Sequence, residues 1–233
     1  EARAVDAGPG RILLEQPIDG RQIAALLGWR QESVATLIAR VTDWLVRWNR
    51  NTLRTRIADR GWLEEQLLQP AAALPSLRER PAYLAWLQQQ CAQLAGQSVP
   101  VVAAHNDLTM SNLLLTAEGE LGVLDWEAAG ERLPLADLFY TVVDAAAAQN
   151  QYRDRLEGFR HCFEVGGRWS QLVNDAEGRI GGVTYTGPEV AALSFHACWL
   201  QHAAAEAAKR LPDEPRPFLN ILERIVDLSL RRD

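Results

Sequence analysis

Residues 105–126 read HNDLTMSNLLLTAEGELGVLDW, and this stretch decides how the rest of the chain is interpreted. It follows a β-rich apolar run at residues 100–104, and it contains two short apolar runs separated by the turn-like residues 117–120. A strand, a turn and a second strand in this order predict a β-hairpin over residues 113–124. Because a lone hairpin is marginal in water, we expect it to lie on helices or to join another strand.

Three oxygen-bearing side chains are placed around this hairpin. Asp107 and Asn112 come from the loop before it, and Asp125 follows its second strand. Because a hairpin returns the chain to its starting point, we expect Asn112 and Asp125 to face each other across the open end. Carboxylate and amide oxygens suit Mg²⁺ that is held together with nucleotide phosphates. Asp107 is then free to approach a substrate hydroxyl, which is the arrangement that phosphoryl transfer requires.

The segments on either side of this β region are predicted to be helical, because apolar residues recur there at intervals of three and four. Residues 11–16 predict a strand, and the Gly-rich residues 170–187 predict a small hairpin or a mobile loop. The fold class expected is mainly α with a small central β-hairpin, that is, α+β. The expected helices are at 23–28, 34–48, 62–68, 82–94, 135–148, 152–165, 189–210 and 217–230, with a connection at 70–81.

Composition narrows the class of protein but does not identify it. The chain has 233 residues, 48% of them hydrophobic, which is enough for one large domain or two small ones. With a net charge of −6 and no basic stretch, it does not resemble a general nucleic-acid binder. No apolar run is long enough to span a bilayer, and no basic leader with an apolar core precedes the rest. Three cysteines without CxxC spacing indicate buried, reduced thiols, so we expect a cytoplasmic protein.

The segments HNDLTMSNLLL (105–115) and GVLDWE (122–127) together resemble the signature of the aminoglycoside phosphotransferase and choline kinase-like superfamily. That superfamily has a protein-kinase-like fold. RILLEQPIDG (11–20) is similar to its hinge between two lobes, and residues 135–138 are similar to the start of its next helix. The resemblance extends from residue 11 to about residue 145.

The resemblance implies an ATP- and Mg²⁺-dependent phosphotransferase whose acceptor is a small-molecule hydroxyl. Asp107 would be the catalytic base, and Asn112 and Asp125 would be the magnesium ligands. His105 would brace the loop, and Asp137 would cap the following helix and hold the backbone of the loop. The hinge backbone would contact the adenine at Leu14, Glu15, Gln16 and Pro17.

The sequence departs from the family pattern in three places. Trp126 rather than phenylalanine follows Asp125, which is common in small-molecule kinases of this type. Asn106 replaces a glycine between His105 and Asp107, a mild change because asparagine tolerates unusual backbone angles. A family member also has a β-rich lobe before the hinge, with a lysine for the nucleotide phosphates. Here ten residues precede Arg11, and the lysine of the chain is Lys209. The resemblance therefore implies a residual hinge or linker at 1–20, a helical catalytic and substrate-binding lobe at 21–233, and an incomplete enzyme.

Two other functions compete with a small-molecule kinase. A non-catalytic kinase-like module, for binding or regulation, would explain a missing lobe but need not keep Asp107, Asn112 and Asp125. A metal-dependent hydrolase would need several more His or Asp ligands. A protein kinase is disfavoured because only eleven residues separate Asp125 from Asp137, which leaves no room for a long activation segment.

The sequence leaves the acceptor, the nucleotide and the oligomeric state undecided, and several other residues are interpreted as structural or surface residues. The acceptor could be an aminoglycoside, choline, an amino-alcohol or a sugar, and the sequence fixes neither ATP over GTP nor the oligomeric state. Trp44 and Trp48 are interpreted as packing residues. The acidic residues Glu127, Glu131 and Asp144 are interpreted as solvated surface.

Overall fold

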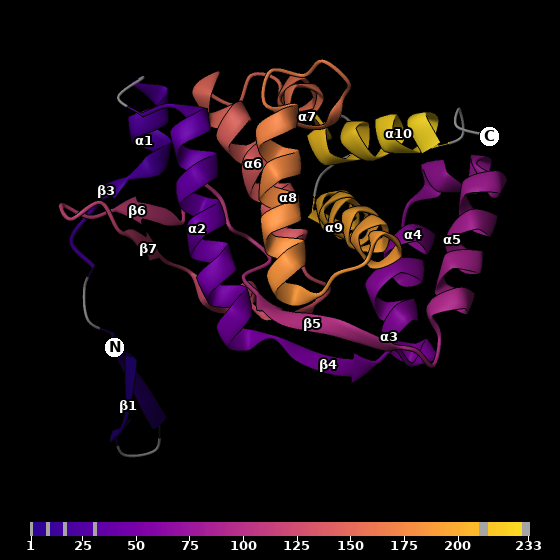
Figure 1. Cartoon of the computed structure of the whole chain (residues 1–233), viewed down its shortest axis with the longest axis horizontal. Coiled ribbons are helices and arrows are strands. Elements are labelled where there is room, and N and C mark those ends of the chain that lie inside the picture. The colour runs from indigo at the N-terminus through magenta and orange to yellow at the C-terminus, as the bar shows by residue number, and fades with distance from the viewer. Residues whose placement is uncertain (1, 8–9, 16–17, 30–31, 210–213, 230–233) are drawn as a thin grey trace.

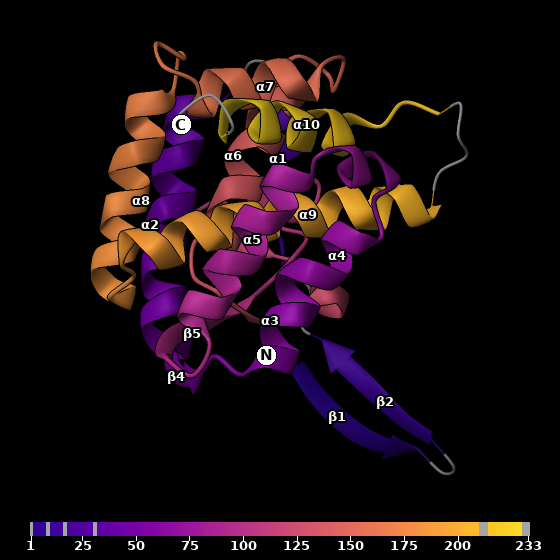
Figure 2. The same ribbon diagram turned by 90° about the vertical axis from the view of Figure 1, so that its right-hand side faces the viewer.

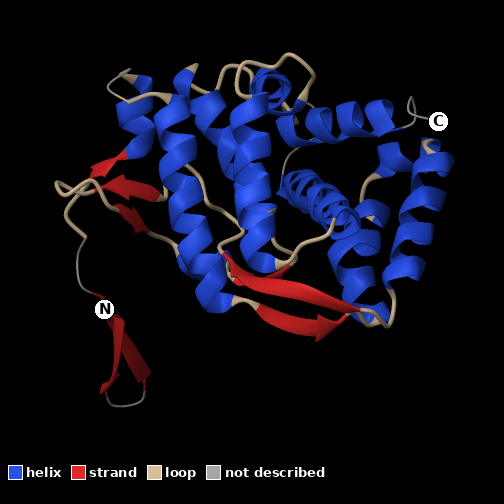
Figure 3. Cartoon of the chain, viewed as in Figure 1, coloured by secondary structure: helices blue, strands red, loops and turns tan. Residues whose placement is uncertain are grey.

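Helices dominate the structure, and the strands form small sheets beside them (Figure 3). The predicted class, mainly α with a small β component, is confirmed. The computed structural model describes the backbone of the chain except at residues 1, 8–9, 16–17, 30–31, 210–213 and 230–233. It describes side chains from residue 18 onward, with the same exceptions.

Most of the predicted helices are present with bounds within a few residues of those expected. In the described part of the chain, the helices are α1 (Ile23–Gly28), α2 (Val34–Thr52), α3 (Arg60–Leu63), α4 (Gln69–Ala72), α5 (Pro81–Leu94), α6 (Ala136–Gln149), α7 (Arg155–Phe163), α8 (Ser170–Thr184), α9 (Pro188–Lys209) and α10 (Pro217–Ser229).

Helix α2 shows why the spacing of apolar residues was enough to predict a helix. Its buried side chains include Val34, Leu37, Ile38, Val41 and Leu45, which recur at three and four residues and so form one apolar face. The side chain of Ser33 accepts a hydrogen bond from the backbone N–H of Thr36, which satisfies one of the free donors at the start of the helix.

Among the described residues, the strands form three small antiparallel sheets. Strand β1 (Ala2–Ala7) pairs with β2 (Gly10–Glu15) (Figure 1). The predicted hairpin is present as β6 (Leu113–Leu115) and β7 (Leu121–Val123), and β3 (Arg21–Gln22) adds a third strand to β6. The third sheet contains β4 (Arg54–Ile57), β5 (Ser98–Ala104) and β8 (Gly130–Arg132), with β5 in the middle. The hairpin therefore joins another strand, as its marginal stability required.

Helix α6 lies at the centre of the helical body and contacts α1, α2, α7 and α9 (Figures 1 and 2). Every residue from Asp137 to Ala148 is buried. Its alanine run lets α7 approach closely, since a Cβ added at Gly158 would lie 3.2 Å from the Cβ of Ala146. A helix buried on all sides is a rigid support for whatever its polar side chains hold.

The prediction for residues 170–187 is wrong. Residues 170–184 form helix α8 rather than a hairpin or a loop, although glycine costs about 1 kcal/mol relative to alanine within a helix. Val173, Ala176 and Ile180 are buried on one face of α8, which packs on α2 and α7. Tertiary burial of this face outweighs the low intrinsic helix propensity.

The expected connection at residues 70–81 is also partly helical. A π-helical turn, η1 (Glu64–Leu68), leads into α4, and a 3₁₀ turn, η2 (Pro75–Glu79), leads into α5. Pro70 is tolerated because it lies in the first turn of α4, where a missing backbone N–H does no harm.

The three cysteines, Cys91, Cys162 and Cys198, are free and buried, as predicted. Burial raises the pKa of the Cys91 thiol to about 11, which keeps it protonated and unreactive at neutral pH. Among the described residues, no helix has both the length and the apolar character needed to cross a bilayer.

Candidate active site

The loop between β5 and β6 is held at its start by Asp137. The two carboxylate oxygens of Asp137 accept hydrogen bonds from the backbone N–H groups of His105, at 2.7 Å, and Asn106, at 2.9 Å. Asp137 is buried, and burial raises its pKa while these two hydrogen bonds oppose the rise. The predicted capping role is wrong, because Leu135 occupies the cap position and Asp137 lies inside the first turn of α6. The expected contact with the loop backbone is present.

Two further residues on the same face of α6 hold the rest of the loop. The hydroxyl of Thr141 donates to the carbonyl oxygen of Leu108 at 2.8 Å. A carboxylate oxygen of Asp144 accepts from the backbone N–H of Met110 at 2.8 Å. Together with Asp137, these side chains follow the helical spacing of three and four residues, so successive turns of α6 bind successive residues of the loop.

Asp144 is not the solvated surface residue that the sequence suggested. It is fully buried, and it forms an ion pair with Arg155 at 2.7 Å and accepts a hydrogen bond from the hydroxyl of Tyr152 at 3.1 Å. The guanidinium of Arg155 also lies over the rings of Tyr152 and Phe218, 4.9 Å from each centroid. The buried charge of Asp144 is therefore compensated on the side of α6 that holds the loop.

His105 links the loop to the end of strand β7. Its Nδ1 accepts a hydrogen bond from the backbone N–H of Asp107 at 3.3 Å. The proton therefore lies on Nε2, which donates to the carbonyl oxygen of Leu124 at 2.7 Å. The ring is fully buried, so His105 fixes Asp107 relative to the residue immediately before Asp125.

Asp107 is partly buried, and its carboxylate has two hydrogen-bond donors nearby. The hydroxyl of Tyr140 lies 3.4 Å from Oδ1, and Nδ2 of Asn112 lies 3.2 Å from Oδ2. Burial raises the pKa of Asp107, and the hydrogen bonds from Tyr140 and Asn112 oppose that rise. Asp107 is thus an oriented carboxylate with increased basicity, which are the properties of a general base.

Asn112 and Asp125 lie at the open end of the β6–β7 hairpin. The backbone N–H of Leu124 donates to the carbonyl oxygen of Asn112 at 2.9 Å, so pairing continues beyond the last strand pair, Leu113 with Val123. Nδ2 of Asn112 donates to the backbone oxygen of Asp107 at 2.9 Å as well as to its carboxylate. Because both partners are acceptors, the amide nitrogen faces Asp107 and Oδ1 points away from it.

Unusual backbone conformations gather at this site. Asn106, Asp125 and Leu135 have φ angles of 65°, 60° and 78°, in the left-handed region that non-glycine residues rarely adopt. At position 106 this explains why asparagine can replace glycine, and its side chain is further held by a 2.6 Å hydrogen bond to the carbonyl oxygen of Ala128. Such strain persists only where the surroundings enforce it, and it is common at functional sites.

The donor atoms at the open end suit a magnesium ion bound through a nucleotide. Among the described residues, no group of three or more His, Cys, Asp and Glu side chains is placed to hold a metal ion. Asn112 and Asp125 supply one amide oxygen and one exposed carboxylate. Mg²⁺ commonly takes only one or two protein ligands and completes its shell with water and phosphate oxygens. The residues therefore fit nucleotide-bound magnesium and do not fit a closed structural metal site.

Tryptophans cover one side of this region. Trp44 and Trp48 stack at 5.4 Å between ring centroids, and Trp126 lies 4.9 Å from Trp48 and 4.8 Å from His105. The indole N–H of Trp48 donates to the carbonyl oxygen of Ala103 in β5. Trp44 and Trp48 therefore pack, as interpreted from the sequence, while Trp126 remains about one-third exposed beside Asp125.

Tyr140, Thr141 and Asp144 were not identified as site residues from the sequence. A signal for them was present, because these polar residues and Asp137 recur at three- and four-residue spacing within an otherwise apolar segment, ADLFYTVVDAAAA. Polar groups on a helix that is buried all round must find hydrogen-bond partners. In the structure these partners are backbone groups of the loop.

A sequence model described as the phosphotransferase enzyme family matches residues 5–169. The matched range covers the loop at 105–112, the hairpin and helix α6, and it ends just before α8. Comparison with curated protein sequences finds no match.

Proposed function

The chain belongs to the phosphotransferase enzyme family, and we propose that it transfers the γ-phosphate of ATP, with Mg²⁺, to a hydroxyl of a small molecule. One observation carries this proposal. The carboxylate of Asp107 is held by Tyr140 and Asn112, while the amide oxygen of Asn112 and the carboxylate of Asp125 remain available at the adjacent strand ends.

In this proposal, Asp107 orients the attacking hydroxyl and accepts its proton. Partial burial increases the basicity of the carboxylate. The contacts from Tyr140 and Asn112 keep one orientation of the carboxyl group, so little reorganisation is needed when an acceptor binds.

Asn112 and Asp125 would hold the magnesium ion, which neutralises charge on the nucleotide phosphates when bound. His105 would maintain the distance between this pair and Asp107, because its ring bonds the backbone of Asp107 and of Leu124. Asp137 would position the loop through its contacts with the backbone of His105 and Asn106.

The nucleotide base would contact the backbone of the hinge. Leu14 and Glu15 lie at the end of β2, whereas Gln16 and Pro17 lie outside the described residues. In this arrangement residues 1–20 act as the hinge, and residues 21–233 form the catalytic and acceptor-binding lobe.

The proposal is tested by measuring release of ADP from MgATP in the presence of a panel of acceptors comprising aminoglycosides, choline, amino-alcohols and sugars. We expect Asp107→Asn to lower turnover at least ~100-fold, as is usual for loss of a positioned base. Binding of MgATP, measured by isothermal titration calorimetry, should change little in this variant. Asn112→Ala and Asp125→Ala should instead weaken the Mg²⁺ dependence of nucleotide binding.

Asp43→Asn provides the control, since Asp43 is an exposed carboxylate that pairs with Arg179 on the outer surface. It should leave both turnover and binding unchanged. Turnover that is equal in Asp107→Asn and in the unmodified protein would contradict the assignment of the base. MgATP binding without turnover for any acceptor would favour the competing function, a non-catalytic kinase-like module.

A further inference from the structure

Two adjoining hollows lie where α8 meets the start of α9, apart from the proposed catalytic loop. The larger has a volume of about 670 Å³ and the smaller about 350 Å³. Glu177, Pro188 and Ala191 line both, so the two hollows are neighbours. Neither is lined by Asp107, Asn112 or Asp125.

The smaller hollow is mainly apolar, and four phenylalanines form part of its wall. Phe139 of α6, Phe159 and Phe163 of α7, and Phe195 of α9 contribute rings to its wall. Phe163 and Phe195 meet edge to face at 5.1 Å between centroids, as do Phe139 and Phe195. Phe139 and Phe159 are almost fully buried, whereas Phe163 and Phe195 are only partly buried and can be reached by a ligand.

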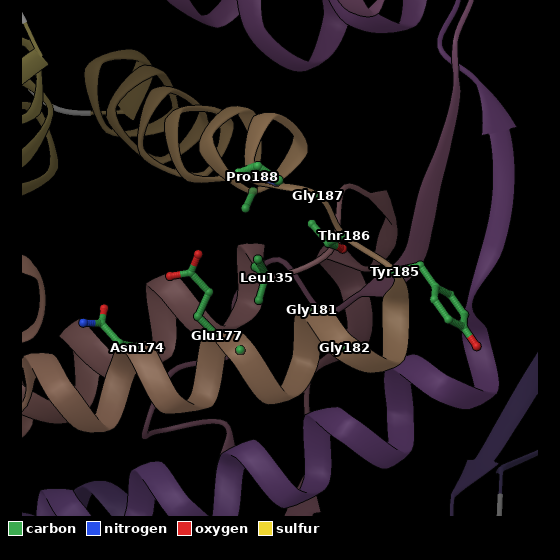
Figure 4. A pocket seen from close by; sticks show the side chains of 11 residues that line it. Leu135, Asn174, Glu177, Gly181, Gly182, Tyr185, Thr186, Gly187 and Pro188 are labelled. Carbon is green, nitrogen blue, oxygen red and sulfur yellow. The ribbon is translucent and has the colours of Figure 1, made fainter.

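Glu177 stands at the junction of the two hollows. It projects from α8 toward the start of α9 at Pro188 (Figure 4). Burial raises the pKa of this carboxyl, and no described residue forms an ion pair or hydrogen bond with its side chain. His196 also lines the smaller hollow, but burial lowers its pKa to about 4, so at neutral pH it does not supply a positive charge. Within the part of the chain that the structure describes, no positive charge faces this carboxylate.

The glycines of α8 keep the larger hollow open. Gly178, Gly181 and Gly182 line it from successive positions on one face. A Cβ added at Gly178 or Gly182 would meet no atom within 4 Å, and neither residue has a positive φ. No steric requirement of the fold explains these glycines, although each costs about 1 kcal/mol of helix stability relative to alanine. Their effect is to leave space next to Glu177.

We propose that the two adjoining hollows together form a binding site for a small molecule with one protonated amine and an aromatic or apolar body. The ammonium group would pair with the carboxylate of Glu177, and the body would enter the hollow lined by the phenylalanines. Concave sites of this size, mostly apolar with a few polar groups that orient the ligand, are typical for small molecules. The site does not depend on the proposed phosphotransfer, because it shares no residue with the Asp107 loop.

The test uses 2-phenylethylamine and its neutral analogue 2-phenylethanol as probes, with affinities from protein-observed NMR titration. We expect the amine to bind about tenfold more tightly than the alcohol, because its ammonium group forms a charge-assisted hydrogen bond in a partly desolvated site. Glu177→Gln should reduce that preference to less than about twofold. Asp175→Asn, which removes an exposed carboxylate two residues away on the same helix, should retain it.

Two more variants distinguish this site from binding elsewhere on the protein. Gly178→Leu should weaken binding of both probes, because its side chain extends into the space that the ligand needs and meets no backbone on the way. Asp107→Asn should leave both affinities unchanged, which excludes binding of the amine as an acceptor at the catalytic loop. Equal binding of the two probes, an unchanged amine affinity in Glu177→Gln, loss of binding in Asp107→Asn, or no binding of either probe would each overturn the proposal.

Discussion

Replacing Asp144 with alanine tests whether α6 anchors the loop between β5 and β6. Two kinds of interaction are lost in this variant. The backbone N–H of Met110 loses its acceptor, 2.8 Å away, and Arg155 loses its ion-pair partner, 2.7 Å away. Arg155 is only 17% exposed at its side chain, so water can replace the lost carboxylate only in part.

The size of the effect follows from burial. Removing one partner of a buried ion pair costs about 3–5 kcal/mol, and a stranded buried N–H adds about 1–3 kcal/mol. The rings of Tyr152 and Phe218 remain in contact with the guanidinium and reduce the penalty. We therefore expect Asp144→Ala to lower the free energy of unfolding by about 4 kcal/mol.

Urea unfolding followed by tryptophan fluorescence measures this value, and Asp43→Ala is the matched control. Asp43 pairs with Arg179 at 2.6 Å, nearly the same separation, but both side chains are more than half exposed. An exposed pair contributes about 0–1 kcal/mol. The double variant Asp144→Ala with Arg155→Ala should recover part of the loss, since no uncompensated charge remains. Equal losses for Asp144→Ala and Asp43→Ala would contradict the stabilising role assigned to the contacts of Asp144 with Met110 and Arg155.

Three further outcomes are expected. Because the hydrogen bond from Tyr140 lowers the pKa of Asp107, Tyr140→Phe should move the acidic limb of the pH–kcat/KM profile to higher pH; a shift to lower pH would contradict this role. Burial raises the folded-state pKa of Asp107 above its usual 3.8. Ionisation of Asp107 therefore lowers the stability of the folded state as the pH rises from 3.8 through the folded-state pKa. Asp107→Asn should accordingly increase stability at pH 7 and have no such effect below pH ~3.8, and chemical unfolding at the two pH values compares them. Gly178→Ala should raise stability by about 0.5–1 kcal/mol in a thermal melt, because the added Cβ meets no neighbour; destabilisation would count against the helical assignment of α8.

Much of the fold followed from the sequence because its segments carry strong local signals. The apolar spacing of α2 and the turn between β6 and β7 both determine local structure without reference to distant residues. Helix α8 was missed because its stability comes from packing on α2 and α7, which local propensity does not report.

The candidate site was predictable in part for the same reason. The placement of Asn112 beside the end of β7 follows from hairpin geometry, which is local. The contacts of Asp144 with Met110 and Arg155 depend instead on how α6 and α7 pack beneath the loop. Spacing alone placed Asp144 and Arg155 on two helices, but it could not show that these two side chains meet or that Asp144 faces the loop.

The proposed catalysis requires Asp107, Asn112 and Asp125 to act around one nucleotide-bound ion. A crystal structure of the protein with Mg²⁺ and a non-hydrolysable ATP analogue shows whether they do. We expect Oδ1 of Asn112 and the carboxylate of Asp125 within about 2.0–2.1 Å of the ion, with Asp107 facing the γ-phosphate across the space for an acceptor hydroxyl. An ion bound elsewhere, or Asp107 directed away from the γ-phosphate, would rule out the roles assigned to these three side chains.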